Sequence, residues 1–525
     1  MLENYTFEEL NITLLPKALG EYSTKFDDKL LLEVAESLNK STDEDLYTSL
    51  ILMQMLAKNN PKMYSALGDR YYYGIGFLKD EQKALALFDK ADKASENGGV
   101  LAKYDLAWYY YDRKEYMRAI EFFKECINKQ HELKDYMIPK CYAHLGFSYM
   151  CLTDPKYQLA IENLTVAAEK YNDNFSKRKL GYLYSNPNSQ FFSPEKAINY
   201  FSVAAKNGDV YSAVEVANYY IFANDDMKIS KNYAAALNYL LPFENSGNID
   251  VIRYLGIIYM NGDDNNNVSY DRKKAAALFE KAIEIDPKDY RNYADLGYVY
   301  YCLDEFALSK KNLTIADENG LHYYSDFLGR MYMRGDLGEV DLKRALYFYE
   351  NAYESNCINN VFTCDEYATL LKNQGYYQKA YDVAEYGEKE YNDICFIFTK
   401  AELVLTDRVK NCISREEAAE LMELCIKYNT ETATAHFLLG NYNYSIQNYR
   451  IAENHYSISF NLGYCNAAIG LARLYEYGGG SITPNPELAY KWYVEAANKG
   501  SDLGRAEAAC FKKGLLGGYR RVRRL

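Results

Sequence analysis

The sequence is poor in the residues that turn a chain sharply. Glycine and proline number 30 and 10 among 525 residues, below the roughly 7% and 5% of an average protein. Because β-sandwiches and barrels need many tight turns, this shortage argues against an all-β fold. The apolar fraction of 49% and the charged fraction of 25% are those of a folded chain and exclude a disordered one.

Long apolar runs and a basic leader are also missing. The richest apolar stretch, LILMQMLA at residues 50–57, is far shorter than the roughly 20 residues that span a bilayer. The N-terminal sequence MLENYTFEELNITLLPK is acidic where a secretory signal is basic. The 11 cysteines form no CxxC pair, which favours free thiols in a reducing compartment. We therefore expect a cytoplasmic protein without a transmembrane segment.

The net charge is negative. The chain has 60 Lys and Arg against 73 Asp and Glu, a formal charge of −13, so it lacks the excess of cations that attracts phosphate backbones. No nucleic-acid partner is expected. The C-terminal segment 512–525 is the exception, because it has two Lys, four Arg and no acid. Its Arg520, Arg521, Arg523 and Arg524 could weakly contact an anionic partner, a membrane surface or the chain's own acids, or remain solvated.

One sequence motif recurs along most of the chain. It reads Leu-Gly, then Tyr three residues after the Gly, and then a small residue in the next apolar segment, as in LGDRYYYG at 67–74 followed by KALALFDKA at 83–91. This small residue recurs twelve times in eleven steps that average about 37 residues, a period typical of helical solenoids. The twelve marker residues are Ala84, Ala119, Ala160, Ala197, Ala236, Ala275, Ser309, Ala345, Ala380, Ala418, Ala452 and Ala489.

Each unit has the pattern of two helices. Apolar residues recur at spacings of three and four in two segments of roughly 12 to 14 residues, with turn residues between them. Small residues at fixed points let two helices approach to roughly 8–10 Å. One such hairpin cannot bury its own apolar face, so neighbouring hairpins must stack into a continuous core. The sequence therefore predicts an all-α fold of about twelve stacked hairpins.

This recurring motif resembles the tetratricopeptide repeat and, in its longer units, the Sel-one-like variant of that repeat. The small residue of the first helix and the marker are 12 residues apart in the unit of Gly297, as in the tetratricopeptide form. They are 16 to 19 apart in the units of Gly68, Gly256 and Gly329, as in the Sel-one-like form. The resemblance covers about residues 64–497. It implies a right-handed α-α superhelical solenoid of the kind that serves as an adaptor between proteins.

The pattern predicts four segments along the chain. We expect an N-terminal helical cap at 1–60, the repeat solenoid at 61–500, a C-terminal capping helix at 501–516 and the basic tail at 517–525. The tenth unit, around Ala401, has neither the Leu-Gly pair nor the Tyr. We therefore expect irregular stacking at this unit.

The resemblance implies that positions one and four after the small residue face the inner, concave surface. These positions are mostly apolar or aromatic in the first seven units and polar in the later ones. Rigid aromatic side chains bind extended or helical peptides at low entropic cost, although the same side chains could instead pack between adjacent helices. The candidate partner-binding residues are Tyr72, Trp108, Tyr111, Phe147, Met150, Tyr182, Tyr298 and Tyr301.

The tyrosine three residues after the small residue is expected to be structural. Aromatic residues at one helical register usually pack in the core, and nine units have this tyrosine. The resemblance also offers a mode that grips a C-terminal carboxylate through Lys three before and Asn one after the Gly. No unit has both residues, so this mode is disfavoured.

No sequence motif indicates catalysis, a metal or a cofactor. Cys141 and His144 are three residues apart, but a structural zinc needs four ligands. The glycine-rich pieces have no P-loop Lys-Ser/Thr and are interpreted as lengthened turns. We predict a non-enzymatic scaffold or adaptor, without cofactor or metal, that holds a protein or peptide partner in the concave groove. A chaperone-like holder of unfolded segments and a regulatory subunit of an enzyme complex remain alternatives.

Overall fold

The computed structural model describes most of the repeat region. The described residues are 49, 51–53, 56–57, 62–75, 78–94, 99–358, 360–410, 412–514 and 518–522. Most of the predicted cap at 1–60 lies outside them, as do Arg523 and Arg524. The chain divides into two compact units, Met1–Lys274 and Ala275–Leu525, and each is described by itself.

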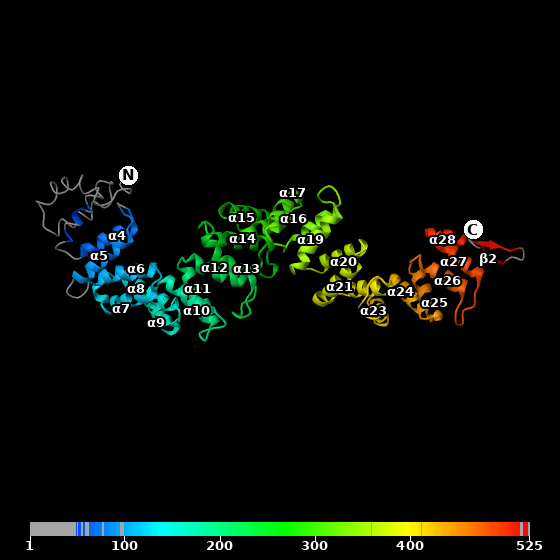
Figure 1. Cartoon of the computed structure of the whole chain (residues 1–525), viewed down its shortest axis with the longest axis horizontal. Coiled ribbons are helices and arrows are strands. Elements are labelled where there is room, and N and C mark those ends of the chain that lie inside the picture. The colour runs from blue at the N-terminus through cyan, green and yellow to red at the C-terminus, as the bar shows by residue number, and fades with distance from the viewer. Residues whose placement is uncertain are drawn as a thin grey trace. The chain divides into compact units, whose positions relative to one another are not determined.

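Unit 1 consists of helices paired in chain order, and neighbouring hairpins lie side by side (Figure 1). The first helices of its hairpins are α4 (Lys62–Tyr73), α6 (Val100–Asp112), α8 (Met137–Met150), α10 (Asn174–Ser185), α12 (Val210–Phe222) and α14 (Ile249–Asn261). The second helices are α5 (Glu81–Ala94), α7 (Tyr116–Asn128), α9 (Tyr157–Thr165), α11 (Pro194–Lys206) and α13 (Tyr233–Leu240). Helix α9 continues as a π-helical turn over Val166–Lys170. Short 3-10 turns span Gln130–Glu132, Leu241–Phe243 and Asp264–Asn266.

Unit 2 repeats the same arrangement after α15 (Arg272–Ile285), in which the division between the units falls. Its first helices are α16 (Tyr290–Cys302), α18 (Ser325–Arg334), α20 (Val361–Asn373), α22 (Ile394–Leu405), α24 (Thr432–Ser445) and α26 (Ala467–Tyr477). Its second helices are α17 (Phe306–Glu318), α19 (Leu342–Glu354), α21 (Tyr377–Tyr391), α23 (Arg415–Lys427), α25 (Tyr449–Asn461) and α27 (Pro486–Asn498). The predicted all-α solenoid of helical hairpins is confirmed.

Short polar side chains begin many of these helices. Asp209 accepts a hydrogen bond from the backbone N–H of Ser212 at the start of α12, and Asn248 accepts one from Val251 at the start of α14. Ser414 and Glu417 form a reciprocal capping box at the start of α23. Each cap satisfies N–H groups that have no partner within their own helix.

Small residues set the distance between the two helices of each hairpin. All twelve marker residues have exposed fractions of 0%. On the facing helix, a Cβ at Gly68 would lie 2.4 Å from the ring of Phe88, and one at Gly181 would lie 2.6 Å from the ring of Phe201. Because real Cβ atoms do not approach so closely, only glycine lets these rings fill the space between the helices.

The recurrent tyrosines pack in or beside the core, as predicted. Tyr71, Tyr110, Tyr149, Tyr184 and Tyr332 are buried, and Tyr220, Tyr259, Tyr300 and Tyr475 are partly buried. Several stack on an aromatic ring of the second helix of their own hairpin. Tyr110 lies 5.7 Å from Phe122 with the ring planes 5° apart, and Tyr332 lies 5.7 Å from Phe348 at 4°. These stacked pairs join the two helices beside the small-residue contact.

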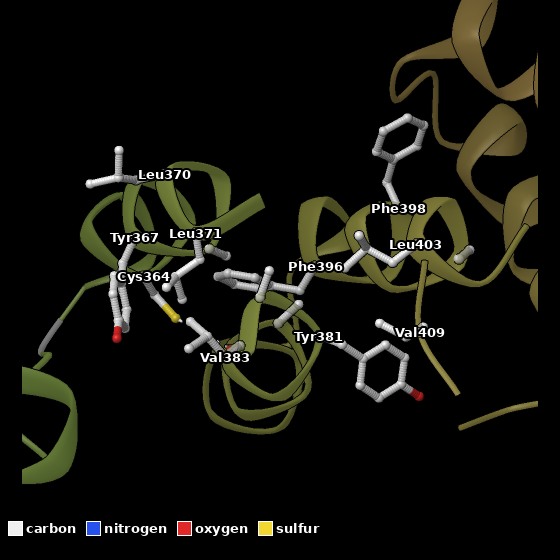
Figure 2. Close-up of a cluster of buried hydrophobic side chains, with 14 of the residues drawn as sticks. Cys364, Tyr367, Leu370, Leu371, Tyr381, Val383, Phe396, Phe398, Leu403 and Val409 are labelled. Carbon is white, nitrogen blue, oxygen red and sulfur yellow. Dashed lines mark hydrogen bonds between the residues drawn. The ribbon is translucent and has the colours of Figure 1, made fainter. Parts of the chain in front are cut away.

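The tenth hairpin, α22 and α23, forms despite its missing Leu-Gly pair. Its Ala401 and its marker Ala418 are both fully buried. Figure 2 shows the Phe396 ring of α22 directed toward Leu371 of α20. The space for this ring comes from Gly387 of α21, where a Cβ would lie 2.5 Å from the ring. In this hairpin the glycine of the close approach is not on the first helix. It lies on the second helix of the preceding hairpin.

The C-terminal end combines a short helix with a β-hairpin. Helix α28 covers Asp502–Ala508, and β1 (Phe511–Lys513) pairs antiparallel with β2 (Tyr519–Arg521). The Tyr519 ring stacks on Tyr490 of α27 at 4.0 Å, and Phe511 is buried against the same helix. The described part of the basic tail therefore packs on the last hairpin of the repeat array.

Candidate functional site

The structure brings three of the predicted groove residues into one aromatic cluster in unit 1. Trp108 and Tyr111 on α6 lie 4.3 and 4.7 Å from the ring of His144 on α8. Phe147, one turn after His144, lies 5.7 Å from Phe175 on α10, and His144 lies 5.0 Å from the same ring. We call Trp108, Tyr111, His144, Phe147 and Phe175 the aromatic cluster. It spans the first helices of three successive hairpins.

His144 is held neutral inside this cluster. Burial lowers the pKa of His144 to about 4, and the charges of Lys140 and Lys179 add to the effect. Its Nδ1 is buried without a hydrogen-bond partner among the described residues. The sequence analysis assigned this histidine no metal site, and the structure surrounds it with aromatic rings.

Two cations of α10 cover the edge of the cluster. The Lys179 Nζ lies 4.5 Å from the centre of the Phe147 ring and 5.2 Å from that of Phe175. The Arg178 guanidinium lies 4.7 Å from the centre of the Tyr211 ring and pairs with Asp209 at 2.9 Å. These cation–π contacts hold the two charged groups over aromatic rings.

The remaining candidates of unit 1 connect neighbouring first helices. Tyr72 is buried, and its hydroxyl donates to Asp112 of α6 at 2.8 Å. Tyr182 is 37% exposed, and its hydroxyl donates to Glu215 of α12 at 2.7 Å. Burial and these carboxylates raise the pKa of both tyrosines. Met150 is partly buried between two core clusters. Tyr182 therefore offers the most accessible ring of the set.

In unit 2 the corresponding row begins aromatic and becomes ionic. Tyr298 stacks on Tyr324 at 4.8 Å with planes 7° apart, and Tyr301 lies 4.7 Å from Phe327. Further along, Arg330 of α18 pairs with Glu366 of α20 at 2.8 Å. Lys372 of α20 pairs with Glu402 of α22 at 2.7 Å, so the polar residues expected here link one first helix to the next.

The sequence analysis missed a cavity of about 250 Å³ between α4 and α6. Two carboxyl groups, Asp69 and Asp105, line it, and neither forms an ion pair within 4 Å among the described residues. The other lining residues are Tyr72, Tyr73, Phe88, Tyr104, Trp108, Tyr109 and Lys140. Asp69 stands one residue after Gly68, which is the register of Trp108 in the next unit. This register was the signal that could have identified it.

Both carboxyl groups are poorly solvated. Burial raises the pKa of Asp69 to about 7, against the charge of the neighbouring Arg70. Burial also raises the pKa of Asp105, and the negative charge of Asp69 raises it further, while the Ser65 hydroxyl lowers it. The two groups thus resist being ionised together. We call Asp69, Asp105 and the seven other lining residues the acidic pocket.

The tail arginines differ in their surroundings. Arg521 forms ion pairs with Glu476 of α26 and Glu507 of α28, so the tail contacts the chain's own acids, one of the destinations considered from the sequence. Arg520 is exposed, and in the strand register it lies directly opposite the exposed Lys512. Two like charges in that position repel each other unless an anion lies between them.

One serine, aspartate and histidine meet in unit 2 without forming a catalytic arrangement. The Ser325 hydroxyl donates to Asp317, and the His322 Nδ1 lies 2.8 Å from the same carboxylate. Because the serine contacts the acid and not the histidine, no base activates it. Asn351 also donates to Asp317 at 3.1 Å, so the carboxylate joins α17, α18 and α19. No metal-ligand group of three His, Cys, Asp or Glu occurs among the described residues.

Comparison with known proteins identifies the repeats. The Sel1 repeat family matches residues 61–91, 176–209, 250–286, 326–357 and 465–501. A sel1-like repeat-containing protein, L21, of Acanthamoeba polyphaga mimivirus is 29% identical over 131 residues, which are 25% of this chain and 21% of that protein. The match thus spans about a fifth of the relative's length. The chain contains Sel1 repeats, as the resemblance to the Sel-one-like and tetratricopeptide repeats predicted.

One solved structure shows the same kind of fold, and a second is similar over part of the chain. The crystal structure of c5321, a protective antigen present in uropathogenic Escherichia coli strains, is described as displaying an SLR fold. It matches with a TM-score of 0.57 at 19% identity over 87% of this chain and 89% of that one. A Sel1 repeat protein from Oxalobacter formigenes matches with a TM-score of 0.40 at 17% identity over 68% of this chain and 91% of its own. Among the described residues, no helix is long and apolar enough to cross a membrane.

Proposed function

We propose that this chain is a protein-interaction scaffold that holds a peptide segment of a partner on the aromatic cluster of unit 1. Sel1 and tetratricopeptide-like solenoids are typically scaffolds for protein–protein interaction and are generally not catalytic. The observation that carries the proposal is the row of rings on three successive first helices, from Trp108 on α6 to Phe175 on α10. A row of that kind matches the repeated side chains of a peptide better than it matches a compact small molecule.

The accessible edge of this row favours a peptide with both apolar and polar contacts. Tyr182 offers a ring that is 37% exposed, together with a hydroxyl already oriented by Glu215. Nearby, the charged groups of Lys179 and Arg178 lie over the rings of Phe147 and Tyr211. Aromatic and arginine side chains in such a setting are the residue types that dominate binding energies at interfaces.

The test is a selection of peptides from a displayed random library on the purified chain, followed by measurement of their dissociation constants. Tyr182→Ala should weaken binding about tenfold or more, because it removes an anchor ring. Tyr157→Ala is the matched control, since Tyr157 is 42% exposed but lies on the second helix α9. It should leave affinity unchanged. Helical circular dichroism of both variants should match that of the unchanged chain.

The outcomes separate the proposal from its alternatives. Equal loss of affinity in the two tyrosine variants would contradict a site on the first helices. Selection of peptides that share only apolar composition, with affinity lost once they are placed inside a folded host, would indicate a chaperone-like holder. A regulatory subunit would be indicated if the selected sequence belonged to an enzyme whose rate changed on binding. Each of these results differs from the one expected of a sequence-specific scaffold.

We also propose a weaker contact between the C-terminal β-hairpin and an acidic segment of a protein partner. The support is the exposed pair of Lys512 and Arg520, which face each other across the strands and form no ion pair within the described residues. Replacing both by Gln should abolish low-salt retention of a poly-glutamate peptide on the immobilised chain. Retention that survives this change would assign the contact to other cations.

A further inference from the structure

We propose that the acidic pocket between α4 and α6 binds a basic side chain, an alkylammonium or a guanidinium, of the peptide held by unit 1. The inference rests on the proposed function for the identity of the peptide, but the pocket itself can be tested without one. Trp108 lines the acidic pocket and also belongs to the aromatic cluster. A chain lying along the cluster would therefore pass the mouth of the pocket.

The two carboxyls of the pocket have no ion-pair partner in the part of the chain that the structure describes. Asp69 and Asp105 are on facing helices, and among the described residues neither forms an ion pair within 4 Å. Lys140 also lines the pocket, but its Nζ lies 5.7 Å from the centre of the Tyr136 ring. Carboxylates removed from water cost free energy unless they are paired. A cation from outside would supply the missing partner.

The walls of the pocket suit the alkyl chain and the charge of a basic residue. Five of the nine lining residues carry tyrosine or tryptophan rings, and such rings attract ammonium and guanidinium groups placed over their faces. The combination of rings and two carboxyls discriminates a basic side chain from an apolar one.

The size of the pocket limits what enters it. Its volume of about 250 Å³ is below the roughly 300–1,000 Å³ of sites that enclose drug-sized molecules. One long side chain fits this space, whereas a whole cofactor does not. The ligand class is therefore a Lys or Arg within a longer chain.

The experiment uses the two tryptophans of the chain as reporters. The protein is labelled with 5-fluorotryptophan, which gives one fluorine resonance each for Trp108 and Trp492, and the Trp492→Phe variant assigns them. The probes are the N-acetyl methylamides of lysine, arginine and norleucine, titrated at pH 8. The lysine or the arginine probe should shift the Trp108 resonance saturably, and the arm that binds more tightly identifies the preferred cation. The norleucine probe should leave the resonance in place.

Paired variants test whether the carboxyls are responsible. Asp69→Asn with Asp105→Asn keeps the shape of the pocket and removes its charge, and should weaken binding of the basic probe about tenfold or more. The matched control is Glu121→Gln with Glu162→Gln, which removes two exposed acids of the second helices α7 and α9. It should leave the affinity within a factor of two. Circular dichroism melting of each variant verifies that it folds.

Three results would overturn the inference. They are an equal response to norleucine, an equal loss of affinity in the control pair, and no shift of Trp108 with either basic probe. These outcomes are separate from the peptide selection. Peptides that bind through Tyr182 but contain no required basic residue would support the scaffold proposal and contradict the pocket proposal. A Trp108 shift without selectable peptides would support the pocket proposal and contradict the scaffold proposal.

Discussion

Gly181 of α10 lies so close to Phe201 of α11 that a Cβ on the glycine would be 2.6 Å from the ring. Gly181→Ala should therefore destabilise this hairpin. Overpacking of this kind costs about 1–3 kcal/mol, and the helix propensity of alanine returns only about 1 kcal/mol. Urea unfolding should show a lower midpoint, and hydrogen exchange should locate the loss in α10 and α11.

A double-mutant cycle tests the cause of that loss. Phe201→Leu shortens the ring that meets the new methyl group, so Gly181→Ala should cost less in the Phe201→Leu background than in the unchanged chain. Additive costs would show that the glycine is needed for its backbone and not for the space that it leaves.

Arg521 forms ion pairs with Glu476 and Glu507, whereas Arg520, its neighbour in β2, is exposed. Arg521→Gln should loosen the C-terminal hairpin, because the Glu476 side chain is only 8% exposed and would lose its cation. Removing one partner of a buried charged pair costs about 3–5 kcal/mol, and a part of that is expected here because Arg521 itself is 34% exposed. Faster hydrogen exchange in β1, β2 and α27 would reveal it.

Arg520→Gln is the matched control for this prediction. It removes the same charge from the same strand without breaking an ion pair, so exchange in α27 should stay unchanged. If both variants loosened the hairpin equally, the net charge of the strand would be responsible and not the two glutamate contacts.

The sequence predicted the hairpins because their signals are local. A marker such as Ala84 and a facing glycine such as Gly68 occupy fixed registers, and stacking fixes what each register must contain. The β-hairpin could not be predicted in this way. Phe511 and Tyr519 are held by rings of α27, and Arg521 pairs with Glu476, which is 45 residues earlier in the chain.

The candidate site likewise has features that the sequence predicts and features that depend on contacts between distant residues. The register correctly placed Trp108, Tyr111 and Phe147 on first helices, where the structure brings them together. It could not show that His144 would be enclosed by their rings. The acidic pocket depends on Asp69 and Asp105 from two helices meeting with little access to water. When each helix is considered alone, its Asp is interpreted as a solvated acid.

Asp69 should make the first hairpin less stable as the pH rises. Its pKa is about 7 in the folded chain against an ordinary value of 3.8, so between these values the folded state binds the proton more tightly than the unfolded state. Stability from this group is present below pH 3.8 and is lost as the pH rises toward 7. Asp69→Asn should therefore raise the urea midpoint at pH 8 more than at pH 4.

The groups that face Asp69 must be considered in this measurement. The Asp69 charge opposes ionisation of Asp105 on α6, the Arg70 charge on α4 favours ionisation of Asp69, and Lys140 on α8 lines the same pocket. Because the Asp69 charge raises the pKa of Asp105, Asp105→Asn should reduce the difference between pH 4 and pH 8 that Asp69→Asn produces in the urea midpoint. An unchanged difference would mean that the two carboxyls do not interact.

His144 should have the opposite pH dependence. Burial lowers its pKa to about 4 from an ordinary value of 6.5, so the unfolded state binds the proton more tightly between these values. The stability that depends on a neutral His144 is complete above pH 6.5 and is lost as the pH falls toward 4. The shift corresponds to about 3 kcal/mol at most. Because α8 lies inside the aromatic cluster, the loss should be local to α6, α8 and α10.

His144→Phe separates this effect from that of the acids. A phenyl ring fills the space among Trp108, Tyr111 and Phe175 without a proton to gain or an Nδ1 to satisfy, so exchange protection of α8 should no longer fall between pH 6.5 and 4. His131→Gln is the control, since the His131 side chain is 78% exposed and should leave the profile unchanged. If the His144→Phe variant still lost protection over that range, carboxylates elsewhere in unit 1 would account for the acid sensitivity. In that case the cluster would tolerate a charged imidazolium, and burial among the rings would not be what keeps His144 neutral.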